Sequence, residues 1–313
     1  MGMLVNGEWT TKWYTPDEKG RFVRSTTSFR DQLEPGGRFA PEPGRYRLYV
    51  AYACPWAHRT LLARSLYGLQ DAIDVSIVDT FMGEDGWAFS ENDGCIPDPD
   101  GAAFLRDVYV RAAADYTGRV TVPVLWDTRE GTIVNNESRE IIRMFSDNFA
   151  AGSGIDLAPV ALRGAIDEAI TANYGPINNG VYMSGFATTQ FAYEEAVTGL
   201  FEGLDRCEAR LGESRYLAGN QLTEADICLF TTLIRFDAVY VCHFKCNLRR
   251  IVDYPNLSNY LRDVYQLPGV AETCRMDHIK QHYFRSHDSI NPHRVVPIGP
   301  ELDFNAPHDR DRF

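Results

Sequence analysis

The stretch that decides the fold is YVAYACPWAHRTLLARSLYGL at residues 49–69, which runs from a strand pattern through one cysteine into a helix pattern. Tyrosine and valine before the cysteine favour a β-strand. Pro55 stands at the first helical position, where proline is tolerated, and Gly68 marks the end of the helix. The segment DVSIVDT at residues 74–80 has a second strand pattern. Together these elements predict a β-α-β unit.

The segments that follow extend this unit into a larger sheet. FLRDVYVRAAADYTG (104–118) has a helix pattern, VPVLWD (122–127) and GTIVNN (131–136) indicate an antiparallel hairpin, and ESREIIRMFSDNF (137–149) predicts another helix. The order β-α-β-α-β-β-α over residues 45–150 is that of the thioredoxin-like fold, an α/β domain with a mixed four-stranded sheet. We therefore expect helices on both faces of this sheet.

Three further segments flank this domain. Residues 155–284 contain helical patterns throughout and predict an all-α bundle. Residues 1–44 are rich in glycine, proline and charged residues and predict an irregular N-terminal extension. Residues 285–313 carry several prolines and predict an extended C-terminal tail.

Composition and charge argue against several classes of protein. The chain has 313 residues and a formal net charge of −12, which opposes binding to nucleic acid. It shows no N-terminal signal pattern and no apolar run long enough to span a membrane, so we expect a cytoplasmic protein without a membrane partner. The seven cysteines lack the number and spacing of a small disulfide scaffold, so we expect most of them to be reduced.

Cys54 lies where the predicted strand ends and the helix begins. There its sulfur faces unpaired backbone N–H groups and the positive end of the helix dipole, which stabilise a thiolate. Such a site can lower the pKa of a cysteine from about 8.5 to about 3.5–7.5. The residue three positions later is Ala57, so a mixed disulfide on Cys54 has to be opened by an outside thiol. This pattern favours chemistry in which glutathione is both partner and reductant.

Several segments carry a resemblance to one family. They are CPWAHR (54–59), the loop residue Trp87, RVTVPVLWD (119–127), NNESREIIRMF (135–145), NNGVYMSGFATTQFAYEEA (178–196) and HIKQHYFRSH (278–287). Together they resemble the glutathionyl-hydroquinone reductases, also called Xi-class glutathione transferases, over nearly the whole chain. The resemblance implies the glutathione transferase fold with extended terminal segments and a homodimer. It also implies cleavage of glutathionyl-hydroquinones to hydroquinone and glutathione disulfide through a mixed disulfide on Cys54.

By this resemblance glutathione is the co-substrate, no metal is needed, and the glutathione contacts are Trp87, Arg119, Val122, Glu137 and Ser138. In thioredoxin-like folds the bond from Val122 to the following proline is cis, which turns the Val122 backbone toward a peptide lying beside it. Glu137 and Ser138 begin a helix, so Ser138 and the backbone N–H groups can hold the γ-glutamyl carboxylate while Glu137 pairs with the ammonium. Arg119 supplies a cation for another carboxylate of glutathione, and the flat ring of Trp87 packs against the tripeptide.

Three tyrosines, Tyr182, Tyr240 and Tyr283, lie in the predicted helical domain. The resemblance implies that they reach the sulfur of Cys54, one as a proton donor and the others stabilising the thiolate. A phenol can donate a charge-assisted hydrogen bond to a thiolate, and it can give a proton to a leaving group. We expect Tyr182 to give or relay the proton while the Cys54 thiolate attacks the glutathionyl sulfur.

Other functions stay open. An Omega-like thioltransferase or dehydroascorbate reductase would share the fold and Cys54 without the hydroquinone specificity. A conventional conjugating transferase would activate glutathione with tyrosine or serine, and an interaction module of the same fold would be non-catalytic. A metal site is a further alternative, because zinc accepts the side chains of Cys242, His243, Cys246, His278 and His282, although their spacing matches no zinc finger or ribbon.

Overall fold

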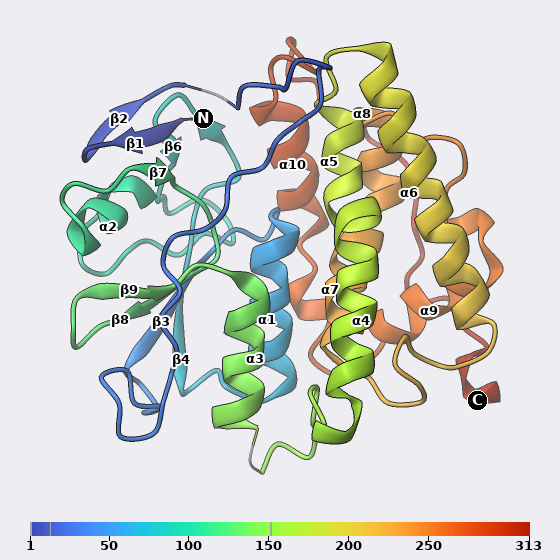
Figure 1. Ribbon diagram of the computed structural model, residues 1–313, viewed down its shortest axis with the longest axis horizontal. Coiled ribbons are helices and arrows are strands. Elements are labelled where there is room, and N and C mark those ends of the chain that lie inside the picture. The colour runs from blue at the N-terminus through green and yellow to red at the C-terminus, as the bar shows by residue number, and fades with distance from the viewer. Residues whose placement is uncertain (1, 13, 151) are drawn as a thin grey trace. The chain divides into compact units, whose positions relative to one another are not determined.

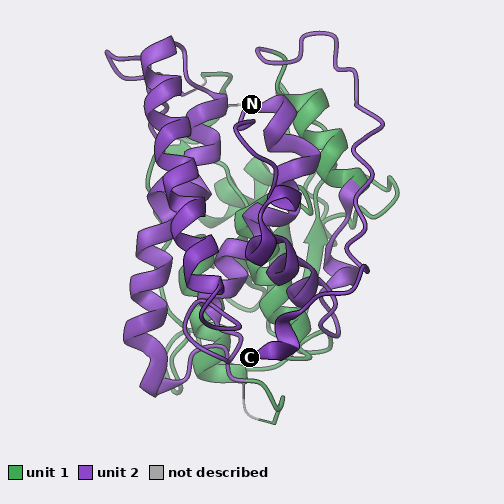
Figure 2. Ribbon diagram, turned by 90° about the vertical axis from the view of Figure 1, so that its right-hand side faces the viewer, with its two compact units in different colours: residues 1–13, 25–155, 277–288 green, residues 14–24, 156–276, 289–313 purple. Residues whose placement is uncertain are grey.

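The structure, a computed structural model, describes residues 2–12, 14–150 and 152–313, and the chain forms two compact units (Figure 1, Figure 2). Unit 1 contains residues 25–155 and 277–288 together with the N-terminal segment, and unit 2 contains residues 14–24, 156–276 and 289–313. Each unit is therefore assembled from separate stretches of the chain. The division into domains at residues 45, 155 and 285 stays a prediction, and residues 1, 13 and 151 lie outside the described residues.

Unit 1 is built on a four-stranded sheet in the order β4-β3-β8-β9. Its strands are β3 (Tyr46–Val50), β4 (Ile73–Ile77), β8 (Val124–Asp127) and β9 (Thr132–Asn135). β3 runs parallel to β4 and antiparallel to β8, and β8 runs antiparallel to β9. Every residue of β3 is buried, as expected for a strand covered on both faces. The predicted mixed sheet of the thioredoxin-like fold is confirmed.

The helices of unit 1 are α1 (Pro55–Leu66), α2 (Leu105–Ala112), α3 (Ser138–Phe149) and α10 (Met276–Ser286). α1 and α3 lie side by side, and Figure 1 shows α2 on the other side of the sheet. Gly68, with a φ of 67°, follows the end of α1, where the left-handed backbone favours glycine. In α3 the apolar residues Ile141, Ile142 and Phe145 are buried, so this predicted helix face packs into the core.

The N-terminal extension is more ordered than its composition predicts. β1 (Met3–Val5) and β2 (Glu8–Thr10) form a hairpin, and β1 also pairs with β7 (Gly118–Arg119). The hairpin turns at Asn6 and Gly7, which both have positive φ, at 49° and 78°. Asn-Gly is the pair that such two-residue turns prefer. The strands span three residues each, which is too short for an alternating pattern to reveal them in the sequence.

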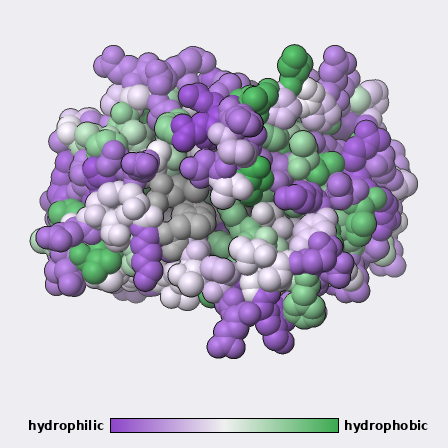
Figure 3. Space-filling view, turned by 90° about the horizontal axis from the view of Figure 1, so that it is seen from above, coloured by the Kyte–Doolittle hydropathy of each residue, from purple (hydrophilic) through white to green (hydrophobic). Residues whose placement is uncertain are grey.

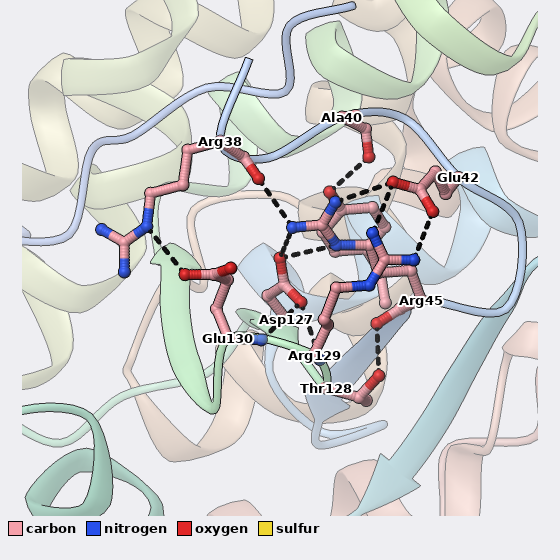
Figure 4. Close-up of polar contacts among 9 residues, drawn as sticks. Arg38, Ala40, Glu42, Arg45, Asp127, Thr128, Arg129 and Glu130 are labelled. Atoms are coloured by element: carbon pink, nitrogen blue, oxygen red, sulfur yellow. Dashed lines mark hydrogen bonds and ion pairs between the residues drawn. The ribbon is translucent and has the colours of Figure 1, made fainter. Parts of the chain in front are cut away.

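A buried ion pair joins the end of this extension to the turn between β8 and β9 (Figure 4). The Arg45 guanidinium donates from Nε and Nη2 to Oδ2 of Asp127, at 2.9 and 2.6 Å. Asp127 is fully buried, and its Oδ1 accepts the backbone N–H groups of Arg129 and Glu130 at 2.9 and 3.1 Å. Glu42 adds a second carboxylate to Arg45 at 2.9 Å. The Asp127 carboxylate therefore organises both the turn and the chain that leads into β3.

Removing this carboxylate should destabilise unit 1. We expect Asp127→Ala to lower the free energy of unfolding by about 3 kcal/mol, because the buried Arg45 charge loses its buried carboxylate, keeping only the more exposed Glu42, and the turn loses an acceptor. Urea unfolding followed by circular dichroism measures the change. The control is Arg38→Ala, which removes an exposed ion pair with Glu130 and should cost less than about 1 kcal/mol. If both variants lost the same free energy of unfolding, the buried Arg45–Asp127 pair would stabilise the protein no more than an exposed pair does.

Unit 2 is all-helical in its described part, as the sequence predicts. Its α-helices are α4 (Arg163–Asn173), α5 (Gly180–Gly185), α6 (Gln190–Leu211), α7 (Glu224–Arg235), α8 (Val241–His243) and α9 (Pro255–Tyr265). Short 3-10 turns span Val160–Leu162, Ile251–Asp253, Ala271–Thr273 and Arg310–Arg312. Two π-helical turns, η2 (Tyr174–Asn179) and η3 (Phe236–Tyr240), lead directly into α5 and α8. Such turns occur frequently at functional sites, and here they adjoin two of the predicted tyrosines.

The surface is largely hydrophilic. Figure 3 shows polar and charged residues over much of the face that it draws, with apolar residues in separate small groups. Exposed apolar side chains such as Val160, Leu248 and Ile298 come from distant parts of the chain. Among the described residues, no helix combines the length and the hydropathy that a membrane crossing requires.

Candidate active site

Cys54 occupies the N-cap position of α1, where the sequence places it. Its backbone is extended, with φ −77° and ψ 120°, and its carbonyl accepts the N–H of His58 at 2.9 Å. The side chain is half-buried, and Sγ donates to the carbonyl oxygen of Val122 at 3.6 Å. The bond from Val122 to Pro123 is cis, as expected. The thiol therefore lies both at a helix start and beside the backbone predicted to bind a peptide.

Glu137 and Ser138 begin α3, also as predicted. Glu137 is the N-cap residue, and its Oε1 accepts the backbone N–H of Arg139 at 3.3 Å. The Glu137 N–H donates to Oδ1 of Asn135 at 2.7 Å, which fixes the turn between β9 and the helix. Ser138 is only 1% exposed. This helix start combines backbone N–H groups with a carboxylate, the two kinds of group that a zwitterionic amino-acid end requires.

The N-terminal extension contacts this helix start. Phe29 N–H donates to Oδ1 of Asn136 at 3.2 Å, and Asn136 N–H donates to the Phe29 carbonyl at 3.1 Å. Nearby, Thr27 Oγ1 donates to Oε2 of Glu137 at 3.5 Å. The extension therefore supports the residues that lead into α3, a function that its composition did not indicate.

Trp87 lies in a small hairpin of its own. The two strands are β5 (Met82–Gly83) and β6 (Gly86–Trp87). Trp87 is 6% exposed, and its ring stacks on His282 of α10 with centroids 4.7 Å apart and an interplanar angle of 23°. Ser286, one turn further along α10, accepts the backbone N–H of Met82 at 3.0 Å. α10 therefore fixes the loop that carries Trp87.

Arg119 ends β7 and contacts the N-terminal segment. Its Nη1 donates to the carbonyl oxygens of Lys12 and Gly2, at 2.6 and 3.3 Å. These bonds hold the β1–β2 hairpin against the domain. The role of Arg119 as a cation for a carboxylate of glutathione stays a prediction.

Tyr182 and Tyr240 lie close together in unit 2. Their ring centroids are 6.2 Å apart, and Phe244 packs against both rings at 5.4 and 5.5 Å. Gly185 permits this packing, because a Cβ there would lie 2.1 Å from the Phe244 ring. The Arg24 guanidinium lies 5.1 Å from the Tyr182 ring centroid. A guanidinium at this distance from a ring centroid makes a cation–π contact with the face of the ring.

Tyr283 belongs to unit 1, on α10. It is buried, and its ring is nearly perpendicular to the rings of His282 and His287 at 5.4 and 5.5 Å. Unit 1 thus contains Cys54 and Tyr283, whereas Tyr182 and Tyr240 belong to unit 2. The approach of these tyrosines to the sulfur of Cys54 stays a prediction.

The residues of the alternative metal site do not converge. No group of three or more histidine, cysteine or acidic side chains suited to a metal ion occurs within the described residues. His278 Nε2 lies 2.8 Å from the carbonyl oxygen of Asp93, and His282 Nδ1 lies 3.0 Å from that of Thr80. These ring nitrogens are therefore engaged by the backbone of unit 1.

All seven cysteines are described, and each is present as a thiol. Burial raises the pKa of Cys207, Cys246 and Cys274 to about 12. These three thiols stay protonated at neutral pH and are poor nucleophiles. Cys54 is half-buried and lies at a helix start, a position where the helix dipole stabilises a thiolate.

Two arginines beside the predicted site were missed by the sequence analysis. Arg59 of α1 donates to Ser138 Oγ at 3.3 Å, and Arg24 lies over Tyr182. One signal in the sequence pointed to Arg59. It lies three residues after Trp56 and four before Ala63, so the three side chains share one face of the helix. An arginine at such a position is usually exposed, so its burial could not be expected.

Comparison with known proteins identifies the family of this chain. Residues 53–148 match the glutathione S-transferase N-terminal domain family, and residues 190–263 match the glutathione S-transferase C-terminal domain family. The chain is 52% identical to the glutathionyl-hydroquinone reductase YqjG of Escherichia coli, over 99% of both chains.

Solved structures give the same result. The Xi-class glutathione transferase of Natrialba magadii matches with a TM-score of 0.95 and 53% identity, covering 100% of this chain and 98% of that chain. The glutathione-bound structure of YqjG from Escherichia coli matches with a TM-score of 0.89 and 51% identity, covering 100% of both chains. The chain therefore belongs to the Xi-class glutathione transferases, the family of the glutathionyl-hydroquinone reductases.

Proposed function

We propose that this enzyme cleaves glutathionyl-hydroquinones to hydroquinone and glutathione disulfide, with Cys54 as the nucleophile. The observation that carries the proposal is the half-buried Cys54 thiol at the N-cap of α1, 3.6 Å from the carbonyl of Val122 and next to a cis proline. Membership of the Xi class supports it, because the Escherichia coli relative is named for this activity.

The first half-reaction transfers glutathione from the ring to the enzyme. Attack on the sulfur of an ordinary aryl thioether would expel an aryl carbanion, which is a poor leaving group. A hydroquinone ring avoids this, because its keto tautomer forms when the carbon that bears sulfur gains a proton and a ring hydroxyl group loses one. The Cys54 thiolate then attacks the glutathionyl sulfur, an S–S bond forms, and the electron pair of the broken C–S bond leaves as a stabilised enolate. The enolate takes up a proton and becomes hydroquinone.

The second half-reaction regenerates the thiolate. A second glutathione attacks the glutathione sulfur of the mixed disulfide, so that glutathione disulfide forms and the Cys54 thiolate leaves. Ala57 occupies the place of a resolving cysteine, which makes the outside thiol necessary. Because the enzyme alternates between two covalent states, ping-pong kinetics follow.

In this proposal glutathione lies along unit 1. The γ-glutamyl carboxylate binds at the start of α3 with Ser138, the ammonium pairs with Glu137, and the cysteinyl backbone pairs with Val122 like an added strand. Trp87 covers the peptide, and Arg119 pairs with its other carboxylate.

The tyrosines act on the reacting atoms in this proposal. Tyr182 supplies the proton to the ring carbon, while Tyr240 and Tyr283 stabilise the thiolate of Cys54. The enzyme works as a homodimer in the cytoplasm, a reducing compartment that supplies the glutathione the reaction consumes.

A comparison of substrates tests the proposal. We expect kcat/KM for a glutathionyl-hydroquinone to exceed that for dehydroascorbate and for a small glutathione mixed disulfide by at least about 10²-fold. The reason is that the tyrosine proton donor contributes on this scale where the leaving group is carbon. An Omega-like thioltransferase would show the opposite order, and a non-catalytic module would turn over none of the three substrates.

A further inference from the structure

Arg59 is a buried cation on the helix that begins at Cys54. It is 2% exposed, its Nη1 donates to Oγ of Ser138 at 3.3 Å, and its Cζ lies 5.9 Å from the Trp56 ring centroid. Its Nε is buried without a hydrogen-bond partner. Because α1 and α3 pack side by side, this contact joins the helix of the nucleophile to the start of the helix that carries Ser138.

In the described part of the chain, the charge of Arg59 is not balanced by a carboxylate. Arginine stays protonated in proteins, and a buried ion is costly unless an opposite charge lies close to it. Within the described residues, no acidic side chain forms an ion pair with Arg59. Buried Arg45 pairs with Asp127. Buried Arg310, whose Nε is also without a hydrogen-bond partner, donates to three backbone carbonyls, whereas Arg59 donates to one serine hydroxyl. Arg59 therefore suits an anion that comes from outside the chain.

Ser138 transmits this charge toward the start of α3. A serine hydroxyl has one donor and two acceptor positions. Because Arg59 donates to Ser138 Oγ, it occupies an acceptor position and leaves the hydroxyl proton for another acceptor. Ser138 is the first residue of α3, so this proton lies at the same helix end as the first-turn N–H groups. A guanidinium that donates to the hydroxyl also makes it a stronger donor.

The Glu137 carboxylate adds a negative charge to this helix end, and a nearby cation offsets it for a carboxylate that binds there. Its carboxylate already accepts the N–H of Arg139 at 3.3 Å, so the site carries a negative charge of its own. A second carboxylate would be repelled by Glu137 unless a positive charge lay near. The amino-acid end of a γ-glutamyl group carries one ammonium and one carboxylate. Glu137 matches the ammonium, and Arg59 acting through Ser138 matches the carboxylate.

We propose that Arg59 is a positioning residue that selects the γ-glutamyl carboxylate of glutathione, by orienting the Ser138 hydroxyl and supplying the balancing positive charge. The inference rests on the proposed function, in which glutathione binds at the start of α3.

Two ligands test the inference by isothermal titration calorimetry. One is S-methylglutathione, and the other is the same molecule with hydrogen in place of the γ-glutamyl α-carboxylate. The S-methyl group prevents reaction with Cys54. Arg59→Met keeps an apolar stem and removes the charge, so we expect it to raise the Kd of S-methylglutathione about 30-fold, the scale of a charged hydrogen bond. For the decarboxylated ligand, we expect Arg59→Met and the wild-type protein to have the same Kd.

Two further variants make the result specific. Arg64→Met is the matched control, because Arg64 lies on the same helix and donates to the carbonyls of Ile73 and Gln70 at 2.6 and 3.0 Å. It should lower Tm without changing either Kd. Arg59→Lys retains the charge without the planar fork, so it should weaken S-methylglutathione binding less than Arg59→Met. Arg59→Lys also keeps the test possible if Arg59→Met does not fold.

The outcomes separate this inference from the proposed function. Loss of affinity confined to S-methylglutathione supports the role of Arg59. An equal loss for both ligands, or no loss for either, overturns it and leaves the proposed function standing. Wild-type protein that binds neither ligand overturns the glutathione site itself, and the inference with it.

Discussion

Cys54→Ser should lower kcat/KM for a glutathionyl-hydroquinone by at least about 10³-fold, the scale on which removal of an essential nucleophile acts. A helix start can ionise a thiol at neutral pH, but the serine hydroxyl stays protonated there and cannot form the S–S bond of the intermediate. The Kd of S-methylglutathione should change little, because its predicted contacts are other residues of unit 1. Chromatography of the hydroquinone product measures the rate.

Mass spectrometry tests the covalent intermediate directly, by detecting glutathione bound to Cys54. Wild-type protein treated with substrate in the absence of free glutathione should carry one glutathionyl group on Cys54. Cys242→Ser is the matched control, because Cys242 is an exposed thiol, and it should keep the wild-type rate and the adduct. A Cys54→Ser enzyme with near wild-type activity, or a wild-type enzyme on which no adduct is ever trapped, would exclude the covalent mechanism.

Tyr182→Phe should give the second large effect, a decrease in kcat of about 10³-fold on a glutathionyl-hydroquinone. Phenylalanine keeps the ring and its packing against Tyr240 and Phe244, but it removes the hydroxyl that, in the proposed mechanism, gives the proton to the ring carbon. The Kd of S-methylglutathione should not change. Steady-state kinetics with saturating glutathione measures kcat.

The same variant provides an internal control. Reduction of a small glutathione mixed disulfide needs no protonation of carbon, so Tyr182→Phe should perform it at close to the wild-type rate. Tyr174→Phe removes a hydroxyl from a 41% exposed residue of the adjacent π-helical turn and should leave both reactions unchanged. If Tyr182→Phe slows the two reactions equally, Tyr182 supports the structure or the thiolate and is not the proton donor.

Local patterns were sufficient to predict the sheet of unit 1. Each strand of the β3-α1-β4 unit has its own propensity, Pro55 and Gly68 delimit the helix, and these local preferences agree with the fold they build. The hairpin of β1 and β2 was missed because three-residue strands carry little pattern. Its one strong signal was the Asn6–Gly7 turn.

Local patterns also predicted part of the candidate active site. The position of Cys54 at the start of α1, the cis bond after Val122 and the start of α3 at Ser138 could be predicted from the sequence. The two helix starts depend on neighbouring residues, whereas the cis bond was expected from the thioredoxin-like fold, because an X-Pro bond taken alone is usually trans. The chemistry of a single thiol without a resolving partner was also contained in the sequence.

The amino-acid sequence by itself thus determined the position of Cys54 at a helix start, the start of α3 and the order of the strands in the sheet. Only the tertiary structure decided that His282 stacks on Trp87, that Arg119 holds the N-terminal hairpin, and that Arg59 is buried against Ser138. These contacts join residues far apart in the chain, and no local propensity encodes them. The environment of a long arginine side chain depends on which helix packs beside it, and that packing exists only once the whole domain has folded.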